Sequence, residues 1–292
     1  MPDPIVVVGD TGIDVLARYD GPVVSGGDRK ADVRTALGGA GANAAAWLAC
    51  LGAPTVLVGR VGDDPAGRQA VAELTEAGVR CEHVVDPAAH TCCVVVLVDG
   101  HGQRTMLSDR GASARLAATD LPRELLVGAA HLHLSGYVLL DESSRPAGVA
   151  MLAAARAAGL TTSVDPQAAA PVDGFIDLVR GVDLLLPNTD ELAALTGSTE
   201  PESATGLLTS VGAVAVTRGA AGACWVDRDG VVAVPAEQVE CVDSTGAGDA
   251  FNAAALIAWL AGAAPVDVLR AGVRAGTAAV RQVGAQPGVR SR

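Results

Sequence analysis

Aromatic residues are rare in this sequence: Phe, Trp and Tyr together make up 2% of its 292 residues. Proteins that stack nucleic-acid bases rely on such side chains. The formal net charge is −12 at pH 7, and Lys and Arg never gather in a run. A surface that follows the phosphates of DNA or RNA is therefore not expected. An anionic ligand has to be held by local groups, such as backbone amides and single arginines.

Disulfide, zinc and membrane patterns are missing as well. The six cysteines are scattered without a C-x-x-C spacing, which argues against a zinc site or a disulfide framework and is typical of reduced cytoplasmic proteins. No stretch approaches the length of an apolar membrane span, and the strand-like run Ile5–Val8 has no basic flank. We therefore expect a soluble, cytoplasmic protein without a membrane or nucleic-acid partner.

Half of the residues are hydrophobic, and short β-branched runs alternate with longer helical stretches rich in Ala and Leu. This alternation predicts an α/β fold with a mostly parallel sheet flanked by helices, in a single domain over residues 1–292. Apolar runs without polar alternation indicate strands that are buried on both faces. The expected strands are 5–8, 55–61, 130–134, 161–164, 184–186 and 213–217, and the expected helices are 42–51, 65–77, 144–158 and 190–195.

Four short strand-like segments break the alternation, namely 15–19, 30–37, 94–98 and 103–107. The last two flank Asp99-Gly100-His101-Gly102, a strong hairpin signal. We expect the four to pair into a small separate sheet, inserted as segments of about 15–37 and 92–110, that covers one edge of the main domain as a lid.

Residues 241–252 read Cys-Val-Asp-Ser-Thr-Gly-Ala-Gly-Asp-Ala-Phe-Asn and lead from a loop into an apolar helix predicted over 250–261. Gly246, Ala247 and Gly248 would present free backbone N–H groups at the helix start, where the helix dipole favours an anion such as phosphate. Asp249 stands within this cradle. A carboxylate beside a phosphate is unfavourable unless it performs chemistry, and removing the proton from a hydroxyl that attacks the γ-phosphorus is such a role.

The same residues also fit a simpler interpretation, in which Ser244 or Thr245 caps the helix and Asp249 is a favourable first-turn charge. That interpretation leaves the paired glycines and Asp243 unexplained. The chain has no G-x-x-x-x-G-K-[ST] motif, so the predicted phosphate site is not a P-loop.

A second glycine-rich segment, Gly38-Gly39-Ala40-Gly41-Ala42-Asn43, lies between the first lid strands and a helix. Its glycines let the backbone approach a ligand, and the Asn43 amide supplies both a donor and an acceptor. Gly39-x-Gly41-x-x-Ala44, with Asp63 or Asp64 about 20 residues on, also matches a dinucleotide fingerprint. An NAD-dependent oxidoreductase is therefore an alternative.

Together the two segments carry a resemblance. Gly38–Asn43, followed by Val58-Gly-Arg-Val-Gly-Asp-Asp-x-x-Gly67, resembles the N-terminal signature of the ribokinase-like (PfkB) carbohydrate kinases, and Asp243–Asp249 resembles their C-terminal signature. The resemblance covers nearly the whole chain and implies a three-layer ribokinase-like fold with a β-sheet lid. It implies transfer of the ATP γ-phosphate, with Mg²⁺, to a hydroxymethyl group of a small carbohydrate such as ribose, fructose or ketodeoxygluconate. It also implies a homodimer formed through the lid. A nucleoside kinase of the same fold and a non-catalytic ligand-binding relative are alternatives.

The resemblance assigns sugar binding to Asp14, Gly38, Gly39 and Asn43. Asp14 matches the family carboxylate that accepts hydrogen bonds from sugar hydroxyls, whereas its position alone fits a turn residue. Arg110 resembles an arginine of ketodeoxygluconate kinases and some fructokinases that would bind a substrate carboxylate or phosphate, and a surface arginine is the alternative. Ribokinase has Lys and Glu where this chain has Ala40 and Ser135, so ribose itself is not secured.

Nucleotide and ion sites follow from the same resemblance. Asn188-Thr-Asp-Glu191 resembles the N-x-x-E element, in which the glutamate helps to position hydrated Mg²⁺, and an acidic helix N-terminus is the alternative. The nucleotide-contact turn is matched by Thr217, Arg218, Gly219 and Gly222. Asp243 and the loop Gly284–Gly288 resemble the site of an activating monovalent cation such as K⁺, although ribokinase typically has Ser where Gly288 stands. Asp165, at the end of a predicted strand, receives no defined role. His131 and His133 share a strand face, but no third ligand is spaced to help them bind a metal.

Overall fold

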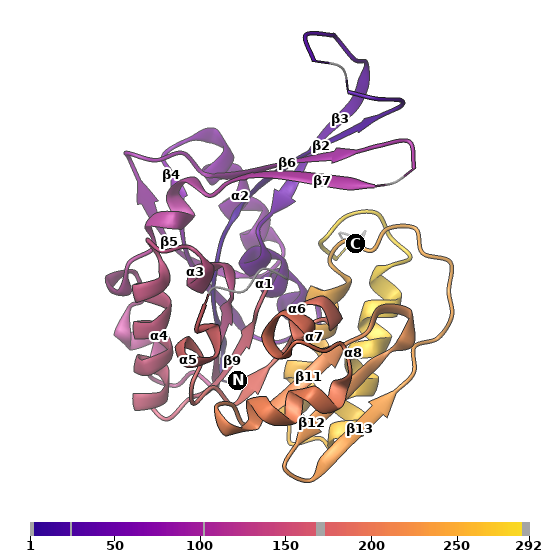
Figure 1. Ribbon diagram of the computed structural model, residues 1–292. Coiled ribbons are helices and arrows are strands. Elements are labelled where there is room, and N and C mark those ends of the chain that lie inside the picture. Colours follow the sequence, from indigo (N-terminus) through magenta and orange to yellow (C-terminus); the bar gives the residue numbers. More distant parts are fainter. Residues whose placement is uncertain (1–2, 24, 102, 168–172, 288–292) are drawn as a thin grey trace.

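The computed structural model describes residues 3–23, 25–101, 103–167 and 173–287 (Figure 1). Nine strands form the main sheet, in the order β13-β12-β11-β10-β9-β8-β1-β4-β5. Neighbouring strands from β11 to β5 are parallel, while β12 and β13 run antiparallel at one edge. The strands are β1 (Ile5–Val8), β4 (Thr55–Gly62), β5 (Arg80–Asp86), β8 (His131–Ser135), β9 (Thr161–Asp165), β10 (Leu184–Leu185), β11 (Ala213–Thr217), β12 (Ala223–Asp227) and β13 (Gly230–Val234). Every strand expected for the main sheet is present, within one residue of its expected bounds.

Helices cover both faces of this sheet and complete the three layers. They are α1 (Ala40–Cys50), α2 (Pro65–Glu76), α3 (Tyr137–Leu140), α4 (Arg145–Ala157), α5 (Phe175–Leu178), α6 (Thr189–Thr196), α7 (Ala247–Leu260) and α8 (Pro265–Ala279). Short 3₁₀ segments are η1 (Gly111–Arg115), η2 (Ala118–Asp120), η3 (Arg123–Leu126), η4 (Pro201–Thr209) and η5 (Gly219–Ala221). None of the helices in the described ranges combines the length and apolar character of a membrane span.

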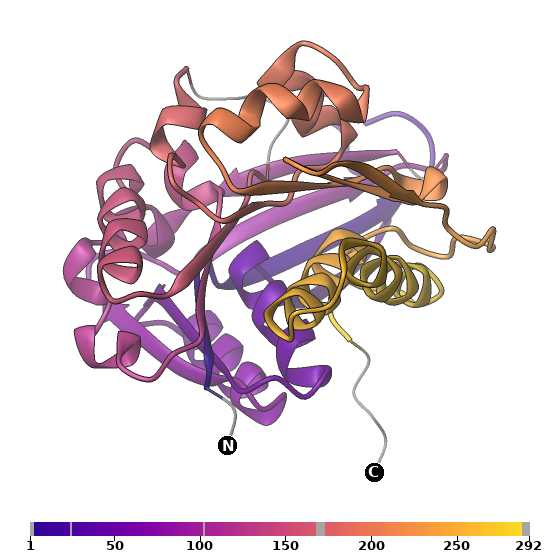
Figure 2. The same cartoon turned by 90° about the horizontal axis from the view of Figure 1, so that it is seen from below.

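Alternate strand residues enter different cores because successive side chains of a strand point to opposite faces. Val6 lies in the core on the α4 side, with Met151, whereas Val7 lies in the core on the α1 side, with Leu48. Figure 2 shows α1 beside the two C-terminal helices, α7 and α8, which are yellow. Strands buried on both faces were expected from their continuous apolar runs, and that expectation is confirmed.

The lid is a four-stranded sheet of its own, in the order β3-β2-β6-β7. Its strands are β2 (Gly12–Tyr19), β3 (Ala31–Gly38), β6 (Cys92–Val98) and β7 (Arg104–Asp109). Figure 1 shows both hairpins projecting from the main body. Strand β2 begins at Gly12, so Asp14 belongs to a lid strand and not to a turn after β1.

Two helices begin two or three residues earlier than the sequence predicts, and both starts lie at the glycine-rich segments. Helix α1 begins at Ala40, not Ala42, and α7 begins at Ala247, not Ala250. Glycine and alanine were treated as loop residues, but in both segments they form the first helical turn. At α1 this is required sterically, since a Cβ on Gly41 would lie 2.6 Å from Cα of Gly9. The end of β1 and the start of α1 are therefore almost in backbone contact.

Candidate active site

A cavity of about 1310 Å³ lies between the lid and the carboxyl ends of the parallel strands. The sequence-predicted residues that line it are Asp14, Gly39, Asn43, Arg110, Asp243 and Asp249. Gly38 lies directly against Asp14, because a Cβ on this glycine would be 2.2 Å from Oδ1 of the carboxylate. The two glycine-rich segments, some 200 residues apart in the chain, thus meet at one site.

A second cavity, of about 520 Å³, lies on the other side of the α7 N-terminus. Ala247 and Gly248 line this second cavity, whereas Asp249 lines the first. Its walls are mostly apolar and include Val239, Val273, Val280, Thr277 and Phe251. Such a wall suits a flat heterocyclic base. Asp249 therefore stands at the junction between a polar cavity and an apolar one.

The predicted nucleotide residues line this second cavity except for Glu191 and Arg218. Asn188, Thr217, Gly219 and Gly222 line it. Gly222 has a φ of 91°, and a Cβ there would lie 2.0 Å from the Val234 carbonyl oxygen, so only glycine fits. Arg218 is directed elsewhere, and its guanidinium donates to Sγ of Cys224 at 3.6 Å.

The start of α7 has the geometry of an anion cradle. Gly246 is its N-cap in the left-handed region, with φ 76°, and α7 has no side-chain cap. A Cβ on Gly246 would lie 2.0 Å from the carbonyl oxygen of Ala285, so this position requires glycine. Thr245, a possible cap in the simpler interpretation, instead donates from Oγ1 to Asp243 at 2.6 Å. The Ala247 amide donates to the Ser244 carbonyl at 3.4 Å. The Gly248 and Asp249 amides of the first turn have no intrahelical acceptors and are left to bind a ligand.

Asp249 has the protonation behaviour of a general base. Burial raises the pKa of its carboxyl, a hydrogen bond with Asn43 lowers it, and the charges of Asp10 and Glu191 raise it further, to about 7. A base with a pKa near 7 is ionised in part of the molecules at neutral pH and is strong enough to accept a hydroxyl proton in the transition state. The same carboxylate is partly accessible from the cavity.

Asp10, two residues after β1, also lines the cavity. It is buried, and its Oδ1 accepts hydrogen bonds from Gly41 N at 3.3 Å and Ser135 Oγ at 3.4 Å. Arg110 donates to its Oδ2 at 3.4 Å. Burial and the charge of Asp10 together raise the pKa of Asp14 to about 6. Asp10 thus orients Arg110 and makes Asp14 a better hydrogen-bond acceptor at neutral pH.

Arg110 points into the cavity and is held on two sides. Its guanidinium carbon lies 4.7 Å from the centre of the Tyr137 ring, a cation–π contact. Its Nε is buried and has no hydrogen-bond partner among the described residues. Buried guanidinium N–H groups normally have acceptors, so a ligand acceptor in this cavity would satisfy it. Of the two interpretations of Arg110, the pocket residue and the surface arginine, the geometry supports the pocket residue.

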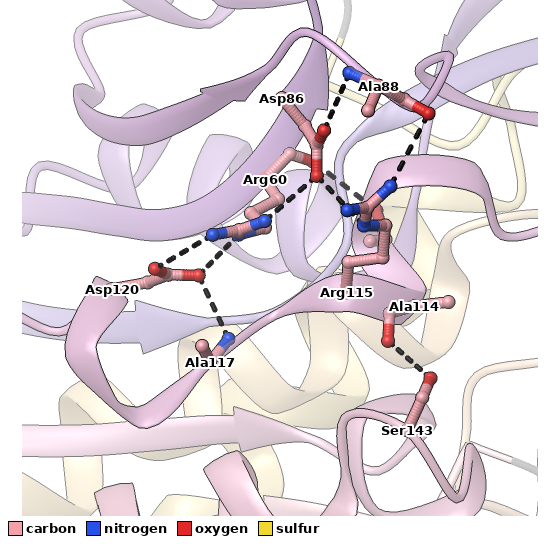
Figure 3. Close-up of polar contacts among 9 residues, drawn as sticks. Arg60, Asp86, Ala88, Ala114, Arg115, Ala117, Asp120 and Ser143 are labelled. Atoms are coloured by element: carbon pink, nitrogen blue, oxygen red, sulfur yellow. Dashed lines mark hydrogen bonds and ion pairs between the residues drawn. The ribbon is translucent and has the colours of Figure 1, made fainter.

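A network of ionic groups fastens the segment that follows Arg110 (Figure 3). Arg60 on β4 donates from Nε to Asp120 at 2.6 Å and from Nη1 to Asp86 at 2.8 Å. Arg115 of η1 pairs with the same Asp86 at 3.1 Å. This network ties η1 and η2 to strands β4 and β5, so it fixes the end of the lid at which Arg110 enters the cavity.

Carboxylates for a magnesium ion lie beside Asp249. Glu191 and Asn188 form a reciprocal capping box, with N–H···O distances of 2.8 and 2.9 Å. Burial raises the pKa of Glu191 to about 7, with a contribution from Asp190. Burial and the charges of Glu191 and Asp249 raise the pKa of Asp165 well above its ordinary value. Carboxylates that raise one another's pKa in this way fit a hard divalent cation, whose charge relieves their repulsion.

The same residues indicate how such an ion would be held. Among the described residues, no three His, Cys, Asp or Glu side chains are arranged to ligate a metal together. Mg²⁺ commonly keeps several waters, and Asp165 and Glu191 would hold it through them. Asp165 is itself oriented by Asn252, whose Nδ2 donates to it at 2.6 Å. Asp165, left without a role by the sequence, thus interacts with both Glu191 and Asp249.

His131 and His133 are structural. Ser163 Oγ contacts the Nε2 of His131 at 2.7 Å and Nδ1 of His133 at 2.8 Å. Burial lowers the pKa of both rings, to about 3 and about 4 respectively, so both are neutral. Their hydrogen bonds satisfy them inside the sheet and leave no reason to invoke a metal.

A carboxylate between a helix N-terminus without a side-chain cap and a polar cavity is an arrangement that suits a phosphotransferase with an alcohol acceptor. Comparison with known families agrees with this class. Residues 3–292 match the pfkB family carbohydrate kinases, and the chain belongs to that family. It is therefore a kinase that phosphorylates a hydroxyl group.

Individual relatives span several substrates. The chain is 32% identical over 272 residues to fructokinase-2 of Oryza sativa subsp. japonica, covering 88% of this chain and 80% of that one. It is also 32% identical over 259 residues to the ATP-dependent ribose-1-phosphate kinase of Halopiger xanaduensis, with coverages of 88% and 84%. Among solved structures, Arabidopsis thaliana ribokinase complexed with ribose and ATP superposes with a TM-score of 0.81 at 28% identity, over 98% of this chain and 95% of that one.

Proposed function

We propose that this protein is an ATP-dependent sugar kinase that uses Asp249 as its general base. The observation that carries the proposal is the position of Asp249, which lines the polar cavity while its helical neighbours Ala247 and Gly248 line the apolar one. ATP would lie in the apolar cavity, with its γ-phosphate at the α7 N-terminus. The sugar would lie under the lid.

In the proposed reaction, a hydroxymethyl oxygen of the sugar attacks the γ-phosphorus of ATP. The Asp249 carboxylate takes the proton of that hydroxyl as the new O–P bond forms. The bond between the γ-phosphorus and the bridging oxygen breaks, and ADP leaves with that oxygen. The amides at the start of α7 hydrogen-bond to the transferred phosphoryl oxygens. Mg²⁺ near Glu191 and Asp165 would neutralise phosphate charge.

The proposed substrate is a small carbohydrate with several hydroxyl groups. Asp14 and Asn43 provide an acceptor and an amide at the cavity wall. Arg110 adds a positive charge at the same cavity, which favours a fructose or ketodeoxygluconate-like sugar, a sugar acid or a sugar phosphate over plain ribose. The relatives named fructokinase and ribose-1-phosphate kinase agree with a substrate of this range.

The proposal is tested by incubating the purified protein with Mg-ATP and a panel of sugars, sugar acids, sugar phosphates and nucleosides, and following ADP release. We expect release with one class of sugar and none in Asp249→Asn. Release with a nucleoside alone would assign the protein to nucleoside phosphorylation. No stimulation by any compound, with ATP binding intact, would indicate a binding protein without kinase activity.

We also propose a homodimer formed through the lid, in the cytoplasm. The face of the lid that points away from the cavity carries Val15, Val33, Val95 and Leu107, and Val33 and Leu107 are 59% and 58% exposed. A second copy of the same apolar face would cover it with two-fold symmetry. Sedimentation velocity should give a dimer for the wild type and a monomer for Leu107→Glu, while Val231→Glu, on the exposed edge strand β13, should stay dimeric.

The proposed cytoplasmic location is supported by the cysteines. All six are free thiols, as is usual for a cytoplasmic protein.

A further inference from the structure

The Asp243 carboxylate is buried beside the phosphate cradle and is fully engaged by donors. Its side chain is 4% exposed. Oδ1 accepts from the Thr245 amide at 2.9 Å and from Thr245 Oγ1 at 2.6 Å, and Oδ2 accepts from the Gly284 amide at 3.1 Å. These bonds shape the turn that leads into α7. A buried carboxylate also requires a positive charge nearby, or its desolvation is not offset.

Arg104 of the lid supplies that charge. Its Nη2 donates to Asp243 Oδ1, and its Nη1 donates to Thr245 Oγ1. Arg104 is the first residue of β7 and pairs with Val98 on the cavity side of the lid. One guanidinium therefore contacts the carboxylate and the hydroxyl of the turn immediately before the amide cradle, reaching them from a segment 139 residues away.

The family resemblance places an activating monovalent cation at Asp243 and the 284–288 loop, of which Gly288 lies outside the described residues. The described part does not fit such an ion. A cation needs oxygens that are free to face it, whereas N–H and O–H groups of Thr245, Gly284 and Arg104 are directed at the carboxylate. The Ala285 carbonyl accepts a hydrogen bond from Trp47 Nε1 at 2.9 Å. An ion at this carboxylate would face donor protons and a guanidinium.

Arg104 can balance the charge of this buried carboxylate at any working pH, because an arginine is not deprotonated in proteins.

We infer that Arg104 is the resident cation of the turn before α7 and takes the place of a monovalent metal ion, so that the kinase works without K⁺. The inference rests on the proposed kinase activity. Arg104 acts as a positioning residue: it holds the Asp243–Thr245 turn and, through it, the first-turn amides that face the transferred phosphoryl group. Because Arg104 belongs to the lid, the cradle is completed only when the lid lies over the cavity.

The test compares the wild type with Arg104→Met, Arg104→Lys and Arg34→Met. Arg34 is a matched control on β3, at the opposite edge of the lid, where it is exposed and pairs with Asp32 two residues away. Each protein is assayed with Mg-ATP and the best sugar of the panel, in tetramethylammonium chloride or in KCl at equal ionic strength. Thermal unfolding midpoints in the two salts provide a second reading that needs no activity.

We expect wild type and Arg34→Met to change less than about twofold between the salts and to keep one midpoint. Arg104→Met should lose about tenfold or more of its turnover without K⁺, since one partner of a buried pair is gone. KCl should restore part of that turnover and raise its midpoint by about 2 °C or more, because K⁺ can now reach the carboxylate. Arg104→Lys should retain most of the activity in both salts.

Two results would overturn the inference. One is a wild type that KCl activates severalfold or stabilises. The other is an Arg104→Met variant that matches Arg34→Met in turnover and in both midpoints. If no compound of the panel is phosphorylated by any variant, the proposed function fails on its own, and the salt dependence of the unfolding midpoints still decides the role of Arg104.

Discussion

Replacing Asp249 with Asn removes the charge of the proposed base while keeping its size. The first expected effect is on turnover, since a positioned general base contributes about 10²–10⁴-fold to a rate. We expect kcat to fall by about 10³-fold in Asp249→Asn, while the affinity for ATP changes little because the α7 amides are retained. In the wild type, kcat/KM should fall as the pH drops below about 7, where Asp249 becomes protonated.

The second expected effect is on stability, and it has the opposite sign. Moving the pKa of Asp249 from 3.8 to about 7 corresponds to about 4 kcal/mol at 1.36 kcal/mol per pH unit. The folded state binds this proton more tightly than the unfolded chain does, so the protonated group favours folding at low pH. That contribution is lost as the pH rises from about 4, where the unfolded chain ionises, to about 7. Asp249→Asn escapes the loss and should be more stable than the wild type at pH 8.

The free energy of unfolding of Asp249→Asn should exceed that of the wild type by about 2 to 4 kcal/mol at pH 8. The lower figure allows for solvent screening on the side of the carboxylate that faces the cavity. At pH 5 the difference between the two proteins should be smaller by about 2 kcal/mol. Urea unfolding at both pH values, together with ADP-release kinetics, measures both effects on one pair of proteins. A stability difference that does not change with pH would refute the raised pKa. Turnover close to that of the wild type would refute the role of Asp249 as base.

Other residues of the site give further expectations. Asp14→Asn should raise the KM for the sugar by about 10- to 100-fold, because a charge-assisted hydrogen bond is lost. In the wild type, the affinity for the sugar should weaken below pH 6 as Asp14 becomes protonated. An unchanged KM in the variant would place the sugar elsewhere. Arg110→Met should abolish any preference for acidic over neutral sugars in the panel, and an unchanged preference would remove Arg110 from substrate recognition. Glu191→Gln should raise the Mg²⁺ concentration needed for half-maximal turnover by about tenfold, and an unaltered Mg²⁺ curve would contradict its role. Asp120→Ala should lower the free energy of unfolding by about 3 kcal/mol, because Arg60 loses a buried partner. If urea titration gave a loss below about 1 kcal/mol, the Arg60 network would not be stabilising.

Local patterns in the sequence were enough to predict six of the nine strands of the main sheet and to propose part of the candidate site. The strands were predicted from short β-branched runs. The lid was predicted because four strand-like segments did not fit the alternation of strands and helices. Asp249 was recognisable because a carboxylate inside a glycine-rich helix start is unfavourable without a function. Arg110 and Asp14 could be named only by resemblance, and their meeting with Asp10 comes from the topology, which brings β1 and the lid together.

Other features carry no local signal. Arg104 and Asp243 are 139 residues apart, and nothing in the composition of either segment indicates that they pair. The early starts of α1 and α7 were missed because glycine has a low helix propensity, whereas close backbone contact excludes larger residues at Gly41 and at the N-cap Gly246. The Arg60 network was missed for a similar reason, since a charged residue inside a strand of the main sheet has its partners at the ends of two other segments.

The distribution of charge around the cavity gives the lid a chemical task beyond excluding water. Among the described residues that line the cavity, the basic ones are Arg18, Arg29, Lys30, Arg104 and Arg110, and all of them belong to the lid or directly adjoin it. The lid also contributes carboxylates, namely Asp14, Asp20, Asp28, Asp32 and Asp99, whereas the fixed floor contributes the carboxylates Asp10, Asp243 and Asp249 and no basic residue. In a protein of net charge −12, such a floor repels the phosphates of ATP unless cations arrive with the lid. A lid that closes over a bound sugar would thus complete the phosphate site only when a hydroxyl acceptor is present. Transfer of the phosphoryl group to water would then be disfavoured, and no additional residue would be needed to prevent it.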